Sequence, residues 1–250
     1  MLSIRQMLYI EFNKISFMED FFNFEEKEYD IPFYNNIPKL SKFEWGLLAL
    51  GLILFYVVLI VPIIASDEVN SLLFCLVLLV PTLYVLKGNW SLMFRKIRRN
   101  DITPILIVVF LQAAYSFGML YILSLLGLAS KAPVDAEAQT TTIISFLSMA
   151  IQLMGEELFK VILLIIVMHI VYRFLNRKQS IIFSLIITLA AFGLLHAGFY
   201  GGVVNVLLIQ GLGSIFEMYL YLKTKNIMVT YASHLLYDCI PIFFELLTLI

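Results

Sequence analysis

The chain alternates long apolar stretches with short polar connections. A helix needs about 20 apolar residues to cross a bilayer, and the stretches of roughly that length are 45–65, 71–86, 102–128, 143–172, 180–197, 203–222 and 227–249. They are continuously apolar, whereas the strands of a membrane barrel alternate apolar and polar residues. The pattern predicts an all-α fold, a polytopic transmembrane bundle of about seven spans that occupies residues 45–250.

Residues 1–44 have a different pattern and are predicted to form a cytoplasmic N-terminal segment and linker. Met1 to Asp30 lacks the features of a cleaved signal peptide. Two interpretations stay open for this part, a loosely ordered tail and a helix on the membrane surface or against the bundle. The second rests on apolar residues that can share one side of a helix, namely Ile4, Leu8, Ile15, Met18 and Phe22. A short linker is predicted at Pro32, Asn35, Asn36 and Pro38.

Basic residues are concentrated in alternate connections. They precede the first stretch and follow the second, fourth and sixth, at Arg5, Lys14, Lys27, Lys39, Lys42, Lys87, Arg95, Lys96, Arg98, Arg99, Arg173, Arg177, Lys178, Lys223 and Lys225. The positive-inside rule then places the N-terminus in the cytoplasm and, with seven spans, the C-terminus outside. An extra break in the fourth stretch, or an embedded N-terminal helix, would reverse the side of the C-terminus.

Composition narrows the function classes. Hydrophobic residues make up 61% and charged residues 14% of the chain, which is far more apolar than a soluble domain. The net charge of −1 indicates no nucleic-acid partner. Cys75 and Cys239 lie in apolar stretches without metal-binding spacing and are interpreted as small core residues. No HExxH, GxSxG or P-loop motif supports a zincin, a serine hydrolase or an NTPase.

The fourth stretch contains two adjacent acids, Glu156 and Glu157, at a depth where an ionised carboxylate is costly unless it is paired or faces a polar cavity. Lys160 lies one helical turn away and can neutralise one carboxylate, which leaves the other free to act as a general base. A neutral Glu–Lys pair that only fixes helix packing is the alternative.

Further polar groups lie in the last three stretches. His196 ends the fifth, and His234 and Asp238 share one face of the seventh. In the sixth, Gln210, Ser214 and Glu217 follow helical spacing; a buried packing seam is favoured over a cavity lining. His169, near a basic end, is interpreted as interfacial.

These motifs occur in a recognisable order: Gly155-Glu156-Glu157-Leu158-Phe159-Lys160, then Phe192-Gly193-Leu194-Leu195-His196, then His234-Leu235-Leu236-Tyr237-Asp238. The set resembles the family of CAAX prenyl proteases type 2 and bacteriocin-processing enzymes, also called the CPBP or Abi family, whose pattern is EExxxR, FxxxH and HxxxN or HxxxD in successive membrane helices. The resemblance covers a core of about residues 143–240. The first half of the chain matches only in being membrane-spanning.

The resemblance implies an intramembrane endopeptidase that hydrolyses a peptide bond in a peptide or lipid-modified precursor. Glu156 and His196 would hold and deprotonate water, with Glu157 and Lys160 supporting Glu156. His234 and Asp238 would stabilise the oxyanion, and Phe192 of the FxxxH motif would have a supporting role.

The cofactor stays open between none and zinc. Two histidines and one glutamate are a standard zinc set, so a metal, if one is needed, would be held by Glu156, His196 and His234. A metal-free mechanism uses the same residues and is slightly favoured.

One departure motivates a second function. The family's arginine falls at Val161, and Lys160 offers a point charge rather than a bidentate fork. The alternative is therefore a non-catalytic immunity or scaffold protein with a membrane-protein partner. A proton-coupled transporter is disfavoured because no interrupted-helix pair is visible. For the leading function the expected partners are a peptide or protein substrate and membrane lipid, and the expected location is a bacterial cell membrane.

Overall fold

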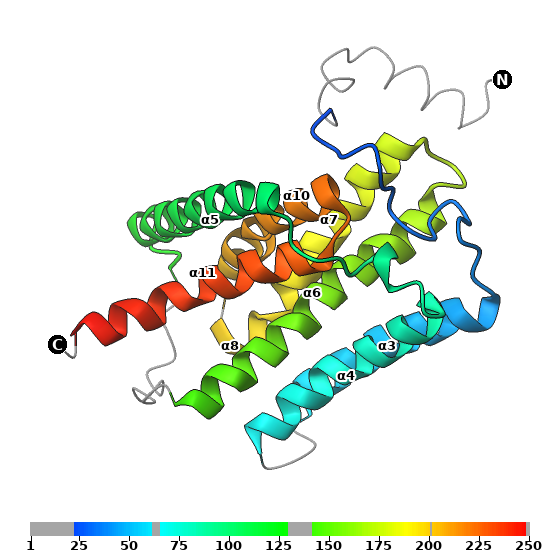
Figure 1. Ribbon diagram of the computed structural model, residues 1–250. Helices are drawn as coiled ribbons and strands as arrows, with labels where there is room; N and C mark the ends of the chain where they lie inside the picture. The colour runs from blue at the N-terminus through cyan, green and yellow to red at the C-terminus, as the bar shows by residue number, and fades with distance from the viewer. Residues whose placement is uncertain (1–22, 62–65, 130–141, 201, 249–250) are drawn as a thin grey trace.

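A computed structural model describes residues 23–61, 66–129, 142–200 and 202–248 (Figure 1). These residues form helices and connections without any strand, which confirms the all-α prediction. The elements are α3 (Lys42–Ile60), α4 (Asp67–Leu86), η1 (Trp90–Leu92), α5 (Arg99–Leu125), α6 (Ile143–Val171), α7 (Arg177–Leu195), α8 (Ala197–Tyr200), α9 (Val203–Val206), η2 (Leu207–Gly211), α10 (Ile215–Thr224) and α11 (Ile227–Thr248).

The helices agree with a bundle of about seven spans. In the described part of the chain, 5 helices are long and apolar enough to cross a membrane: 42–60, 68–86, 99–125, 177–195 and 203–224. The fourth predicted span, α6, is 29 residues long and carries Glu156, Glu157 and Lys160. The seventh, α11, has a shorter apolar stretch over 227–243. Because α6 is one unbroken helix, the alternative of a break in the fourth stretch is wrong.

The centre of the bundle is α6, which packs on α3, α4, α7 and α11 (Figure 1). Small residues allow the closest approaches. A Cβ on Gly155 would lie 3.1 Å from the Cα of Cys75, so only glycine lets α6 approach α4 this closely. Gly193 of α7 and Gly211 of η2 meet in the same way, since a Cβ on Gly193 would lie 2.7 Å from the Val206 carbonyl oxygen. These contacts bring the polar residues of α6, α7 and the sixth span toward one interior region.

Segment 23–41 packs across one end of the bundle (Figure 1). We call this end of the bundle the basic end, because the helix termini there carry Lys87, Arg98, Arg177 and Lys225. The other end of the bundle, where α6 begins and α7 finishes, is called the opposite end. The prediction of a helix from Ile4 to Phe22 falls outside the described residues.

Apolar and charged contacts hold segment 23–41 in place. Ile31, Phe33 and Tyr34 are buried, which the predicted linker did not anticipate. Glu25 accepts hydrogen bonds from Arg177 at 2.7 Å and from Lys225 at 2.6 Å. This end of the bundle is therefore closed by a packed layer.

Glu25 makes the stability of this layer depend on pH. Burial alone would raise the pKa of Glu25, but the hydrogen bonds and charges of Arg177 and Lys225 outweigh it and lower the pKa below the ordinary value of 4.5. A carboxylate with a lowered folded-state pKa contributes its stability above the unfolded pKa and loses it as the pH falls below that value. We expect Glu25→Gln to cost about 1–3 kcal/mol near neutral pH.

Thermal unfolding in detergent micelles over a pH series measures this effect. The deficit of Glu25→Gln relative to wild type should be constant around neutral pH and shrink below about pH 4.5. The exposed Glu28 provides the matched control, because Glu28→Gln should leave the free energy of unfolding unchanged. A deficit for Glu25→Gln that is the same at every pH would contradict the assignment to an ionised carboxylate.

Candidate active site

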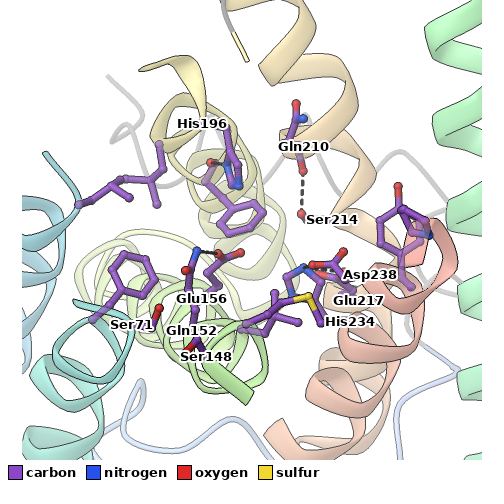
Figure 2. A pocket seen from close by; sticks show the side chains of 18 of the residues that line it. Ser71, Ser148, Gln152, Glu156, His196, Gln210, Ser214, Glu217, His234 and Asp238 are labelled. Atoms are coloured by element: carbon purple, nitrogen blue, oxygen red, sulfur yellow. Dashed lines mark hydrogen bonds and ion pairs between the residues drawn. The ribbon is translucent and has the colours of Figure 1, made fainter. Parts of the chain in front are cut away.

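A cavity of about 920 Å³ lies in the interior between α4, α6, α7, the sixth span and α11 (Figure 2). Its lining includes the polar candidates Glu156, His196, His234 and Asp238, together with Phe192. Figure 2 shows the four polar side chains arranged around the same space. The structure thus brings acids and imidazoles from three separate spans to one cavity.

Beside the cavity lies a group of four buried residues, Glu157, Lys160, Glu217 and His234, which we call the charge cluster. The Lys160 ammonium lies 2.5 Å from Glu157 Oε1 and is also paired with Glu217 Oε2. The same Glu157 oxygen lies 2.7 Å from His234 Nδ1. Because isolated buried charges are very costly, these contacts explain how two carboxylates are tolerated inside the bundle.

Glu217 is a member of this cluster and also lines the cavity, as Gln210 and Ser214 do. The favoured prediction of a plain packing seam is therefore wrong, and the cavity-lining alternative describes these residues. Its other oxygen, Oε1, accepts a hydrogen bond from Gln112 Nε2 of α5 at 2.8 Å. Gln112 was not predicted. The signal that could have found it is a lone amide in the middle of an apolar stretch, where an unpaired polar group is costly.

Glu157 was expected to support Glu156, but its contacts are with other residues. Glu157 binds Lys160 and His234, while the hydrogen bond to Glu156 Oε1 comes from Gln152 Nε2 of the same helix, at 3.2 Å. Glu156 is 7% exposed and faces the cavity. Glu157 therefore orients His234, and Glu156 remains directed at the cavity.

His196 and Asp238 lie toward the opposite end. His196 follows the last residue of α7, and its Nδ1 lies 2.9 Å from the carbonyl oxygen of Phe192. If Nδ1–H donates there, Nε2 carries the ring's lone pair. Asp238 Oδ2 lies 3.9 Å from His234 Nε2, one helical turn away on α11.

Counting residues from the basic end places Glu156, His196 and His234 at different depths for upright helices. The structure brings them to one cavity without a break in α11, which runs as a single helix from Ile227 past Ser233. The helices instead cross obliquely (Figure 1). The sixth span is also irregular, because Leu207–Gly211 forms a π-helical turn, a feature frequent at functional sites.

Val161, at the position of the family's arginine, is fully buried among apolar residues. Lys160 supplies the positive charge instead. Its ammonium meets carboxylates from α6 and α10 and lies 4.7 Å from the centre of the Phe192 ring. A compact point charge can bridge two carboxylates in this way, so the buried acids are compensated without a guanidinium.

Donor atoms suited to a metal come together in the charge cluster. Among the described residues, the group of three that lies within 4.8 Å consists of Glu157, Glu217 and His234. The expected trio of Glu156, His196 and His234 is not gathered this tightly. Zinc accepts such donors, but the Lys160 ammonium already contacts both carboxylates, so a second cation there would meet like-charge repulsion. The cluster as arranged does not fit a metal ion.

Comparison with protein families agrees with this site. Residues 138–240 match the family described as type II CAAX prenyl endopeptidase Rce1-like. The match confirms the resemblance to CAAX prenyl proteases, and the matched segment contains Glu156, Glu157, His196 and His234. A comparison with curated proteins and one with solved structures gave no match. With its apolar helices, the chain is a multi-pass membrane protein, and the match over residues 138–240 supports a CAAX-type intramembrane endopeptidase in general.

Proposed function

We propose that this protein is an intramembrane endopeptidase that uses Glu156 and His196 to activate water for hydrolysis of a peptide bond in a peptide or lipid-modified precursor. The observation that carries the proposal is the cavity of about 920 Å³ into which Glu156, His196, His234 and Asp238 all face. Uncatalysed peptide hydrolysis lacks a general base, a second water-binding group and groups that stabilise the oxyanion.

Glu156 is the proposed base. The neutral amide of Gln152 donates a hydrogen bond to its carboxylate, which orients the carboxylate without adding a positive charge. His196, with its lone pair on Nε2, accepts a hydrogen bond from the same water. The proton taken from water by Glu156 is then delivered to the leaving amine, which completes hydrolysis without a covalent intermediate.

His234 is proposed to donate a hydrogen bond to the oxyanion. Glu157 and Glu217 carry two negative charges against one positive charge on Lys160, so a protonated imidazole at His234 makes the charge cluster neutral. Nδ1–H then donates to Glu157, and Nε2–H is available beside Asp238 and Glu217 at the cavity. A donor held in place before the reaction stabilises the tetrahedral oxyanion most strongly in a water-poor site.

A cleavage assay tests the proposal. The full-length protein in proteoliposomes is mixed with fluorogenic peptides, some with a prenylated cysteine followed by three further residues, and His196→Ala is expected to lower the rate by about 10²-fold or more. His169→Ala is the matched control, because His169 stacks on Trp45 near the basic end, away from the cavity, and its loss should leave the rate within about twofold of wild type. Equal rates for wild type and His196→Ala would remove His196 from the mechanism.

Metal removal separates the two cofactor expectations. Because Lys160 occupies the centre of the charge cluster, we expect dialysis against a chelator to change the rate by less than about twofold. A loss restored by Zn²⁺ would favour a metal-dependent reaction. If neither protein nor variants cleave any peptide, and function in cells survives loss of the Glu156 carboxylate, the immunity or scaffold alternative is favoured.

A further inference from the structure

A row of polar side chains leads from the opposite end of the bundle to Glu156. It consists of Thr142, Ser145, Ser148 and Gln152, which we call the polar track. These residues are spaced three or four apart, so they lie on one face of α6 and its N-terminal cap. All of them line the cavity.

Burial increases steadily along the track. Thr142 and Ser145 are exposed, Ser148 and Gln152 are half-buried, and Glu156 is buried. Ser71 of α4, which is itself buried, and Tyr237 of α11 also line the cavity. In the part of the chain that the structure describes, the cavity, which we call the channel, is therefore most open where α6 begins and more enclosed at the proposed general base.

A track of hydroxyl and amide groups suits an extended polypeptide. Each residue of such a chain brings one N–H and one C=O that need partners when they leave water. Serine and threonine hydroxyls and the glutamine amide can both donate and accept hydrogen bonds. An apolar lipid chain would gain nothing from these groups, so the track points to a peptide backbone rather than to a lipid.

The charged residues that line the channel indicate which substrate side chains it prefers. Its lining includes the acids Glu68, Glu156, Glu217 and Asp238, whereas no lysine or arginine lines it within the described part of the chain. Lys160, which lies outside the cavity lining, compensates the charge of Glu217. Glu68 is exposed at the open end. A concave site with an excess of negative charge attracts cationic groups and repels anionic ones.

We infer that the substrate is an extended polypeptide segment with neutral or basic side chains, which enters from the opposite end and lies along the polar track. Since the positive-inside rule places the basic end in the cytoplasm, entry is from the non-cytoplasmic side of the membrane. Segment 23–41 covers the basic end, whereas the exposed track residues Thr142 and Ser145 lie at the opposite end. This inference rests on the proposed function for the cleavage step.

Kinetics of track variants test the binding role. Ser148→Leu is expected to raise KM for a cleaved peptide by about tenfold or more and to change kcat by less than about threefold, because Ser148 would bind substrate without touching the reacting bond. Ser124→Leu is the matched control, since Ser124 is an exposed serine near the end of α5 outside the cavity lining. If Glu156→Gln is inactive while Ser148→Leu has the KM of wild type, the inferred binding role of the polar track is overturned and the proposed function stands. If Glu156→Gln still cleaves, the proposed function itself fails.

Charge preference is tested with paired peptides that differ only by Lys or Glu beside the scissile bond. Wild type should prefer the Lys peptide by about tenfold in kcat/KM at low salt, and Glu68→Lys should reduce or reverse this preference. Equal rates for the two peptides in wild type would overturn the charge preference.

The side of entry is tested without any substrate. Ser145→Cys and Lys96→Cys are treated in intact cells with a membrane-impermeant maleimide, and wild type, with its own Cys75 and Cys239, gives the background. We expect Ser145→Cys to react from outside and the exposed basic-end position Lys96→Cys to react only after permeabilisation. The reverse pattern would place the open end of the channel in the cytoplasm and overturn the inferred side of entry.

Discussion

Glu156→Gln should abolish peptide hydrolysis while the protein stays folded, with a rate loss of about 10²–10⁴-fold. The substitution keeps the size and polarity of the side chain, and the Gln152 amide can still hydrogen-bond to it. It removes the negative charge and with it the ability to take a proton from water. The loss should therefore appear in kcat at saturating peptide, with little change in KM.

The measurement is steady-state cleavage by wild type and variant in the same proteoliposomes, with circular dichroism to show equal helix content. Glu28→Gln is the matched control, because Glu28 is an exposed acid at the basic end and its loss should not change the rate. Cleavage by Glu156→Gln at the wild-type rate would show that this carboxylate is not the base.

Lys160→Met is expected to destabilise the protein by about 3–5 kcal/mol, the usual cost of leaving a buried charge without its partner. Methionine fills similar space but removes the ammonium that contacts both Glu157 and Glu217. The two buried carboxylates are then left beside His234 without the ammonium that compensates them. The resulting repulsion and unpaired burial account for the large effect.

Unfolding in detergent micelles, driven by heat or by a denaturing detergent, measures this loss. The triple variant Lys160→Met, Glu157→Gln, Glu217→Gln should recover most of it, because both carboxylates are removed together with the ammonium, and His234 can then be an uncharged imidazole. Lys96→Met, at an exposed lysine, should have no measurable effect. A single Lys160→Met variant as stable as wild type would show that the charge cluster is not ionised as described.

The membrane fold could be predicted well because the thickness of a bilayer sets the length of each apolar stretch. The seventh stretch was expected from residue 227, where α11 begins, and the long fourth stretch corresponds closely to α6. Segment 23–41 was harder to interpret. Its proline and asparagine residues indicate a linker, whereas burial of Ile31, Phe33 and Tyr34 depends on the shape of the bundle end that they meet.

The candidate site was predicted in part. His196, His234 and Asp238 stand out because polar groups at membrane depth are rare and costly, and the cavity contains all three. The polar track was missed because serine and threonine are common in membrane helices, and spacing alone does not distinguish a cavity lining from a packing seam. Lys160 was expected to pair within α6, and its second partner, Glu217, became visible only when α10 was placed beside it.

Local patterns in the chain were sufficient to define the helices, their approximate ends and the residues capable of chemistry, because hydrophobic length and the cost of buried charge act on each segment separately. The pairing of Glu157 with His234, the hydrogen bond from Gln112 to Glu217 and the channel that ends at Glu156 depend on how separate helices cross. Crossing geometry results from close packing between residues far apart in the chain, such as Gly193 against Gly211, and no single segment contains that information.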